Sequence, residues 1–215
     1  MKKRNKWILI TILLILISFY VDSSIINLFE GIKNPWLDSF FIGITFVSSE
    51  IIIFFLLTSL FLWKENKRRW ILPLWLTLLL SAVISFIIKF LIQRPRPFQV
   101  GIVEIMKIFQ NMSFETWNFS FPSFQTMFVF CAVPILAREF PKLKKLWILL
   151  AVLVGVSRVY FGLHFMSDVL AGGLLGYLIG LWVIDLEEEN RFGESFYRKI
   201  FMIKKESDDY SDKVN

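Results

Sequence analysis

Long apolar segments alternate along the chain with short clusters of charged residues. Apolar runs cover residues 7–21, 39–63, 70–92, 122–140, 146–161 and 164–184. Such blocks have the length that crosses a bilayer, where a helix needs about 20 residues to span the hydrocarbon core. The pattern therefore predicts an all-α integral membrane protein, folded as a bundle of six transmembrane helices.

The remaining segments are predicted to connect these helices. Residues 22–38 have the composition of a loop, and residues 100–110 are expected to form a short helix at the interface. A basic N-terminus ahead of an apolar run is also typical of a signal peptide. However, Val21-Asp22-Ser23-Ser24 is a poor cleavage site, so we interpret residues 7–21 as the first span. Residues 1–184 are the predicted membrane domain, and 185–215 are a charged tail that begins as a helix.

The distribution of basic residues predicts the orientation of the bundle. The N-terminus, the 64–69 loop and the 138–145 loop each carry four Lys or Arg. With six spans these three segments lie on one side, which the positive-inside rule assigns to the cytoplasm. Both termini are therefore predicted to be cytoplasmic. The polar residues at the other ends of the helices then face the extracytoplasmic side of a cytoplasmic membrane.

Composition agrees with the membrane class and excludes some kinds of site. The chain is 56% hydrophobic, whereas soluble proteins are about 45–50% apolar. The net charge of +6 comes from short clusters between apolar blocks, which does not indicate a nucleic-acid surface. The single cysteine, Cys131, and the single histidine, His164, exclude a disulfide and a multi-histidine or cysteine zinc site. No metal or cofactor is predicted.

The candidate chemistry centres on that one histidine. His164 and Asp168 are four residues apart, so on a helix they share a face and the carboxylate can hydrogen-bond the imidazole. The other ring nitrogen then presents a lone pair, as a nucleophile or a base requires. Arg158 lies just upstream, and a guanidinium holds phosphate oxygens in a fork.

Other polar residues fall at the same predicted end of the bundle. The set comprises Lys89, Arg94, Arg96, Ser123, Gln125, Arg158, His164 and Asp168. Several cations around a His–Asp pair suit phosphate, and a helix starting at Pro122-Ser123 adds N–H groups that favour an anion. A single basic residue here could instead extend to lipid headgroups. A set on three helix ends, on the side where basic residues are disfavoured, indicates a functional site.

Three motifs carry a family resemblance. Lys89-x6-Arg96-Pro97, Pro122-Ser123 and Ser157-Arg158-x5-His164-x3-Asp168 resemble the signature of the type 2 phosphatidic acid phosphatase superfamily. The resemblance implies a six-helix membrane core and a metal-independent phosphatase acting on a phosphorylated membrane lipid. It also implies that His164 forms a phosphohistidine and that Asp168 orients it. The phosphoryl oxygens would then be bound by Lys89, Arg96, Ser123 and Arg158.

The second motif departs from the family pattern. Where the family usually has Pro-Ser-Gly-His, this chain has Pro122-Ser123-Phe124-Gln125. The resemblance places Gln125 where a histidine donates a proton to the leaving group, but an amide cannot exchange a proton at neutral pH. A general acid contributes about 10²–10⁴-fold where the leaving group needs one. Phe124 and Arg94 are auxiliary candidates for the site.

Three hypotheses for this departure stay open at the level of sequence. The enzyme could act on a leaving group that needs little protonation, as in undecaprenyl diphosphate or a lipid A-type 1-phosphate; a phosphatidylglycerophosphate-like lipid is a further candidate. Alternatively, Glu115 or a bound water could supply the proton. Finally, the protein could bind or transport phosphorylated lipid, or pass the phosphoryl group to another lipid. The predicted function is hydrolysis of a lipid phosphate or diphosphate in the outer leaflet.

Glu50 is an acidic residue within the second apolar run, beside Ser48 and Ser49. A buried carboxylate of this kind is often neutral or paired with a helix neighbour. The alternative is a role in placing a headgroup or carrying a proton.

Overall fold

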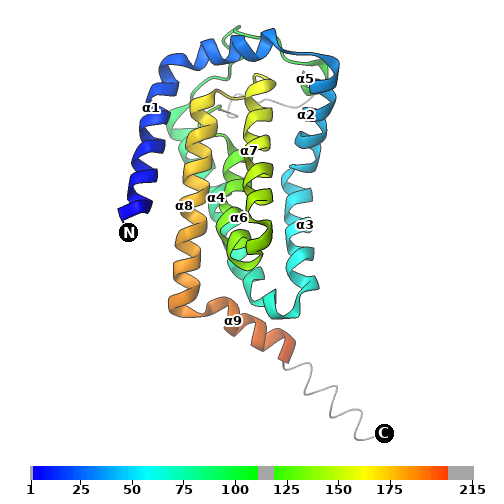
Figure 1. Cartoon of the computed structure of the whole chain (residues 1–215), viewed down its shortest axis with the longest axis vertical. Helices are drawn as coiled ribbons and strands as arrows, with labels where there is room; N and C mark the ends of the chain where they lie inside the picture. Colours follow the sequence, from blue (N-terminus) through cyan, green and yellow to red (C-terminus); the bar gives the residue numbers. More distant parts are fainter. Residues whose placement is uncertain (1, 111–118, 203–215) are drawn as a thin grey trace, which may run out of the picture.

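The computed structural model describes residues 2–110 and 119–202, which form helices and turns without a strand in those two ranges. The α-helices are α1 (Lys2–Gly31), α2 (Pro35–Val47), α3 (Glu50–Trp63), α4 (Ile71–Ile92), α5 (Lys107–Gln110), α6 (Phe124–Glu139), α7 (Lys144–Tyr160), α8 (Met166–Asn190) and α9 (Phe192–Tyr197). Helix α6 lies at the centre and packs against α4, α7 and α8 (Figure 1). Helix α1 flanks α8 on one side, and α2 and α3 flank the bundle on the other.

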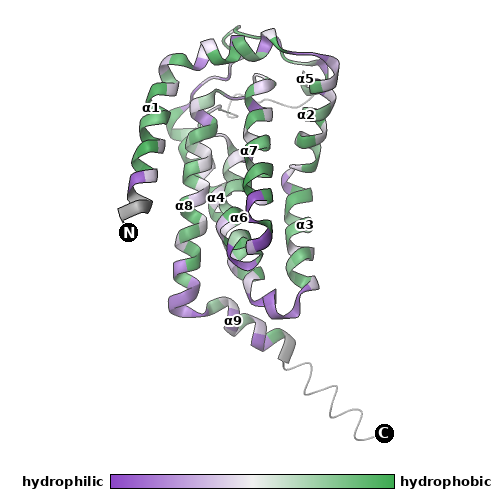
Figure 2. Ribbon diagram, in the orientation of Figure 1, coloured by the Kyte–Doolittle hydropathy of each residue, from purple (hydrophilic) through white to green (hydrophobic). Residues whose placement is uncertain are grey.

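The lengths of the helices support a membrane bundle. Within residues 2–110 and 119–202, three apolar helical segments are long enough to cross a bilayer: Lys6–Gly31, Glu65–Ile92 and Met166–Asn190. Helices α2 and α3, bent by 61° at a short break, make a fourth if they are taken together. Hydrophobic residues run along the helices, and hydrophilic ones gather toward the two ends of the bundle (Figure 2). The all-α membrane class is supported, while the count of six spans stays a prediction because α6 and α7 have only 16 and 17 residues.

The predicted loop at residues 22–38 is wrong. Helix α1 continues to Gly31 and α2 begins at Pro35, so the connection is only three residues long. Asn34 starts α2 because its side-chain oxygen accepts the N–H groups of Trp36 and Leu37, and a proline suits the first helical position. The last turns of α1 consequently lie across the end of the bundle (Figure 1).

Three other boundaries also differ from the predictions. The continuous helix expected over residues 39–63 breaks at Ser48, whose carbonyl and hydroxyl groups accept hydrogen bonds from Gln125 of α6. A long-range side chain thus satisfies the backbone at the break. The interfacial helix expected over 100–110 is confined to Lys107–Gln110. At the C-terminal end, α8 extends past the predicted span to Asn190 and α9 follows, so the segment after residue 184 begins as a helix, as predicted.

Glycines allow α8 to lie against the backbone of α6. A Cβ at Gly172, Gly176 or Gly180 would lie 2.5, 2.3 or 2.2 Å from a backbone oxygen of α6 or of Ser123, which immediately precedes it. The glycine spacing therefore reflects close packing inside this bundle, as small residues permit in membrane proteins. This packing holds the first turn of α6 against the first turn of α8, where Ser123 N–H donates to the Asp168 carbonyl at 3.0 Å.

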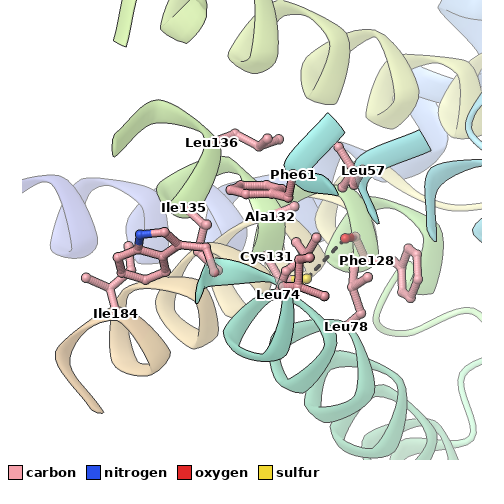
Figure 3. Close-up of a cluster of buried hydrophobic side chains, with 12 residues drawn as sticks. Leu57, Phe61, Leu74, Leu78, Phe128, Cys131, Ala132, Ile135, Leu136 and Ile184 are labelled. Atoms are coloured by element: carbon pink, nitrogen blue, oxygen red, sulfur yellow. Dashed lines mark hydrogen bonds between the residues drawn. The ribbon is translucent and has the colours of Figure 1, made fainter. Parts of the chain in front are cut away.

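A hydrophobic cluster joins α3, α4, α6 and α8 (Figure 3). Its members include Leu57, Phe61, Leu74, Leu78, Phe128, Cys131, Ala132, Ile135, Leu136 and Ile184. Phe61, Leu74 and Cys131 are fully buried. The Cys131 thiol donates to the carbonyl of Phe128 at 3.1 Å, so this cysteine acts as a small core residue.

We predict that Gly176→Ala destabilises the fold, because the added methyl group would push the α6 and α8 backbones apart. The expected loss in unfolding free energy is about 1–3 kcal/mol, the usual range for overpacking. Thermal unfolding in detergent measures it. Gly43→Ala on α2 is the matched control, since nothing lies within 4 Å of its added Cβ. Equal melting temperatures for the two variants would contradict the packing argument.

Candidate active site

The turn between α7 and α8 brings the third motif together. Helix α7 ends at Tyr160, and Gly162, two residues later, lies in the left-handed region at φ 64°, where a Cβ would lie 2.4 Å from Val103 Cγ2. The N–H groups of Leu163 and His164 donate to the carbonyl of Arg158 at 3.0 and 3.3 Å. This tight turn fixes His164 close to the end of α7 and immediately before α8.

His164 is therefore not on a helix, which corrects the predicted shared helical face with Asp168. The Nδ1 atom of His164 lies 3.7 Å from Asp168 Oδ2, a close approach that is too long for a hydrogen bond. Ser120 bridges the two: its hydroxyl donates to Asp168 Oδ2 and lies 3.4 Å from Nδ1. The sequence analysis missed Ser120, although its place two residues before Pro122 was a usable signal.

The other ring nitrogen faces a cation. His164 Nε2 lies 3.2 Å from Arg96 Nη1. Because a guanidinium can only donate, Nε2 must accept and the proton of the neutral ring sits on Nδ1. Nδ1–H then points toward Ser120 and Asp168, and Nε2 carries the lone pair.

Asp168 is held as an anion in the first turn of α8. Its Oδ1 atom accepts from Arg94 Nη1 at 2.7 Å, and its Oδ2 atom accepts from the N–H of Phe165 at 2.8 Å. Its side chain is fully buried. Hydrogen bonds and the positive end of the helix together stabilise a buried carboxylate.

The basic residues of the motifs lie close to the histidine. Arg96 is buried and donates to the carbonyl of Leu163 at 2.8 Å as well as approaching His164. Lys89 is buried at the end of α4 and donates to the carbonyl of Phe119. Burial lowers the pKa of Arg96 to about 10, opposed by the negative charge of Asp168. A bound dianion would balance the positive charge that these residues concentrate.

Burial and the positive charge of Arg96 lower the pKa of His164 to about 3, and the charge of Lys89 acts in the same direction. The imidazole is therefore neutral at pH 7. A neutral ring with its lone pair on Nε2 is the form required for nucleophilic attack on phosphorus.

Gln125 is held by hydrogen bonds at both ends of its side-chain amide. Its Nε2 donates to the carbonyl and hydroxyl oxygens of Ser48 at 2.7 and 2.9 Å, and its Oε1 accepts from Arg158 Nη1 at 2.6 Å. Arg158 also donates to Thr45 Oγ1. Gln125 thus ties Arg158 to the break between α2 and α3.

Ser123 and Phe124 contact residues of α6. The Ser123 hydroxyl is buried and hydrogen-bonded to Thr126 Oγ1 at 2.9 Å. Phe124 packs on Phe128, with ring centroids 5.5 Å apart, at the edge of the hydrophobic cluster.

The remaining charged candidates are Arg94, Glu50 and Glu115. Arg94 contacts two carboxylates, those of Asp168 and of Asp22, which the sequence analysis had placed in a loop. Glu50 occupies the first turn of α3, and its charge acts on Arg158. Glu115 lies outside the described residues.

The single histidine makes its protonation directly measurable. We predict that protein labelled with ¹⁵N-histidine, prepared without a histidine tag, keeps the signals of a neutral Nδ1–H ring from pH 8 to pH 5, because the folded-state pKa lies well below 6.5. The measurement is a pH series of imidazole ¹⁵N spectra in detergent. A titration midpoint near 6.5, the value of an unperturbed histidine, would contradict the burial argument.

Comparison with known proteins agrees with this geometry. Residues 70–192 match the family model described as the PAP2 superfamily. Phosphatidylglycerophosphatase B of Bacillus subtilis is 30% identical over 173 residues, covering 74% of this chain and 79% of that protein. An undecaprenyl-diphosphatase of Sulfolobus acidocaldarius is 30% identical over 137 residues, covering 60% of this chain and 61% of that protein.

A solved structure of a PAP2-type phosphatase is also similar to this chain. The crystal structure of a transmembrane PAP2-type phosphatidylglycerolphosphate phosphatase from Bacillus subtilis matches with a TM-score of 0.65 and 27% identity, covering 86% of this chain and 98% of that one. The resemblance predicted from the three motifs is confirmed, and with it the class of lipid phosphate hydrolases. The chain belongs to the PAP2 superfamily.

Proposed function

We propose that this protein removes a phosphate or diphosphate group from a membrane lipid at the extracytoplasmic face, through a phosphohistidine at His164. The observation that carries the proposal is the buried neutral imidazole, with its Nε2 lone pair turned toward Arg96 and its Nδ1 toward Ser120 and Asp168. This polarity matches a nucleophile whose lone pair is on the cationic side of the site and whose other ring nitrogen faces an anion.

The reaction follows from that arrangement. When a phosphoryl group binds, Arg96 turns from Nε2 to the phosphoryl oxygens, and Lys89 and Arg158 hold the remaining charge. Nε2 forms a bond to phosphorus while the bond from phosphorus to the leaving oxygen breaks. The imidazole becomes positive, and the anionic Asp168 stabilises that charge through Nδ1–H. Water then attacks phosphorus, which releases phosphate and restores the neutral ring.

Gln125 restricts the leaving group under this proposal. Its amide cannot give up a proton, and both ends of the amide are already hydrogen-bonded. Expelling an alkoxide without an acid is difficult, whereas a phosphate leaves more easily because its second pKa is about 6. A lipid diphosphate such as undecaprenyl diphosphate is therefore favoured over phosphatidic acid. A lipid A-type 1-phosphate, whose leaving oxygen is anomeric, lies between them.

The same amide contacts favour alternatives to hydrolysis. A scaffold that lacks a proton donor and fixes Arg158 through Gln125 suits a protein that binds or transports phosphorylated lipid, or that passes the phosphoryl group to another lipid. Phosphate release by the purified protein separates hydrolysis from these alternatives.

We also propose the topology: six spans in residues 1–184, both termini in the cytoplasm, and residues 185–215 as a cytoplasmic tail. Lys67 pairs with Glu139 at 3.0 Å, which joins two of the three basic clusters. The turn that carries His164 lies at the opposite end of the bundle from the α3–α4 connection (Figure 1). The positive-inside rule then supports an outward-facing site in a cytoplasmic membrane.

We predict that the purified protein releases phosphate from undecaprenyl diphosphate at least about 10²-fold faster than from phosphatidic acid, because the diphosphate does not need a general acid. Initial rates in detergent, with phosphatidylglycerophosphate and a lipid A 1-phosphate in the same panel, measure this preference. His164→Ala is the blank and is expected to be inactive. Equal rates on the two lipids would refute the restriction on the leaving group. Release from none of the four would refute the hydrolase.

Gln125→His tests the missing acid directly. The new imidazole is expected to raise the ratio of phosphatidic acid to diphosphate turnover, because it can protonate an alkoxide. Gln125→Asn is the matched control: its shorter side chain weakens the contact to Arg158 but adds no acid, so the ratio should stay at the wild-type value. A ratio that rises equally in both variants would show that the acid is not what matters.

A further inference from the structure

Helix α1 reaches the site through one buried carboxylate. Asp22 is only 3% exposed. Its Oδ2 atom accepts from Arg94 Nη2 at 2.7 Å and from the Ser167 hydroxyl, and its Oδ1 atom accepts from the Ser167 N–H at 3.0 Å. An ionisable group inside an apolar helix is costly and is usually retained for function. The proposed reaction gives Asp22 no role.

Arg94 connects Asp22 to the histidine's anion. One end of its guanidinium, Nη1, binds Asp168 Oδ1 at 2.7 Å, while the other end, Nη2, binds Asp22. The guanidinium also lies against two aromatic rings, 4.0 Å from the centroid of Phe165 and 4.8 Å from that of Phe19. The fork of Arg94 is thus shared between two carboxylates.

Because its guanidinium is shared, Arg94 binds Asp168 through one carboxylate oxygen only. Arginine and a carboxylate prefer a bidentate pair, in which both carboxylate oxygens are taken. Because Asp22 occupies Nη2, Arg94 binds a single oxygen of Asp168. The second oxygen, Oδ2, stays available to Ser120 and lies 3.7 Å from His164 Nδ1.

We propose that Asp22 is a positioning residue for the phosphatase reaction: by holding Arg94 and Ser167, it keeps Oδ2 of Asp168 directed at His164. This inference rests on the proposed function. Helix α1, which lies outside the three motifs, then forms part of the catalytic apparatus. Arg94 holds Asp168 in place and does not bind phosphate.

The test variant is Asp22→Asn, which keeps the size of the side chain and removes its charge. An asparagine oxygen can accept from Ser167 or from Arg94, but its NH₂ group then faces the other donor. Arg94 is released to pair with both oxygens of Asp168. We expect kcat on the preferred lipid to fall about 10–100-fold, which is the usual effect when a residue that orients a functional side chain is lost. KM should change less than about 3-fold. The ¹⁵N signals of the single histidine should move.

Two variants complete the comparison. Ser18→Ala removes a buried hydroxyl from the same helix, one turn earlier, whose partner is the Ile15 carbonyl of α1 itself. It is expected to keep both kcat and the histidine spectrum. Asp22→Glu restores the charge and should recover part of the kcat lost in Asp22→Asn.

The outcomes separate positioning from a structural role. If Asp22→Asn lowers the melting temperature but leaves kcat and the imidazole signals at wild-type values, Asp22 only anchors α1 and the proposal is wrong. If Asp22→Asn does not fold, Ser167→Ala, which removes one contact to Asp22 and one to Arg94, should lower kcat in the same direction. Unchanged kcat and signals in that variant would overturn the proposal. If the wild-type protein hydrolyses no lipid, the proposed function fails, and the imidazole signals still report whether Asp22 positions Asp168.

Discussion

The structure depends on how charges are accommodated inside an apolar helix bundle. Lys89, Arg96 and Arg158 are buried at one end of the helices, where isolated cations would be strongly disfavoured. Each is tied to a backbone carbonyl or a polar side chain, and the buried carboxylate of Asp168 lies close to them. The excess positive charge makes a neutral histidine and an anionic ligand the stable partners of this site. Phosphate chemistry is a consequence of that balance.

Close packing of two helices keeps the arrangement rigid. Gly172 and Gly176 bring the backbone of α8 onto that of α6, so the segments that carry Ser123 and Asp168 meet through a backbone hydrogen bond. Gly162 turns the chain sharply enough to place His164 between the ends of α7 and α8. The site is therefore built from helix ends held by backbone contacts, which suits a reaction that relies on orientation and charge.

Much of this could be predicted from the sequence because the signals are local. The apolar runs predicted α4, α6, α7 and the start of α8 to within about two residues, and motif spacing selected His164, Arg96 and Arg158. The parts that were missed depend on partners far along the chain. Asp22, followed by two serines, has the composition of a loop, and a helical carboxylate there is explained by Arg94, 72 residues away, and by Ser167, 145 residues away. Likewise, the break after α2 depends on Gln125, and the bridging role of Ser120 depends on the fold that brings it to Asp168.

Trapping the phosphoryl group on the protein tests whether His164 accepts it. Protein mixed briefly with a ³²P-labelled lipid diphosphate would be quenched in alkali, which preserves phosphohistidine, and digested to locate the label. With one histidine in the chain, the assignment is unambiguous. We expect alkali-stable label on the peptide that contains His164 and none in His164→Ala. Label on another residue, or phosphate release by His164→Ala at the wild-type rate, would contradict it.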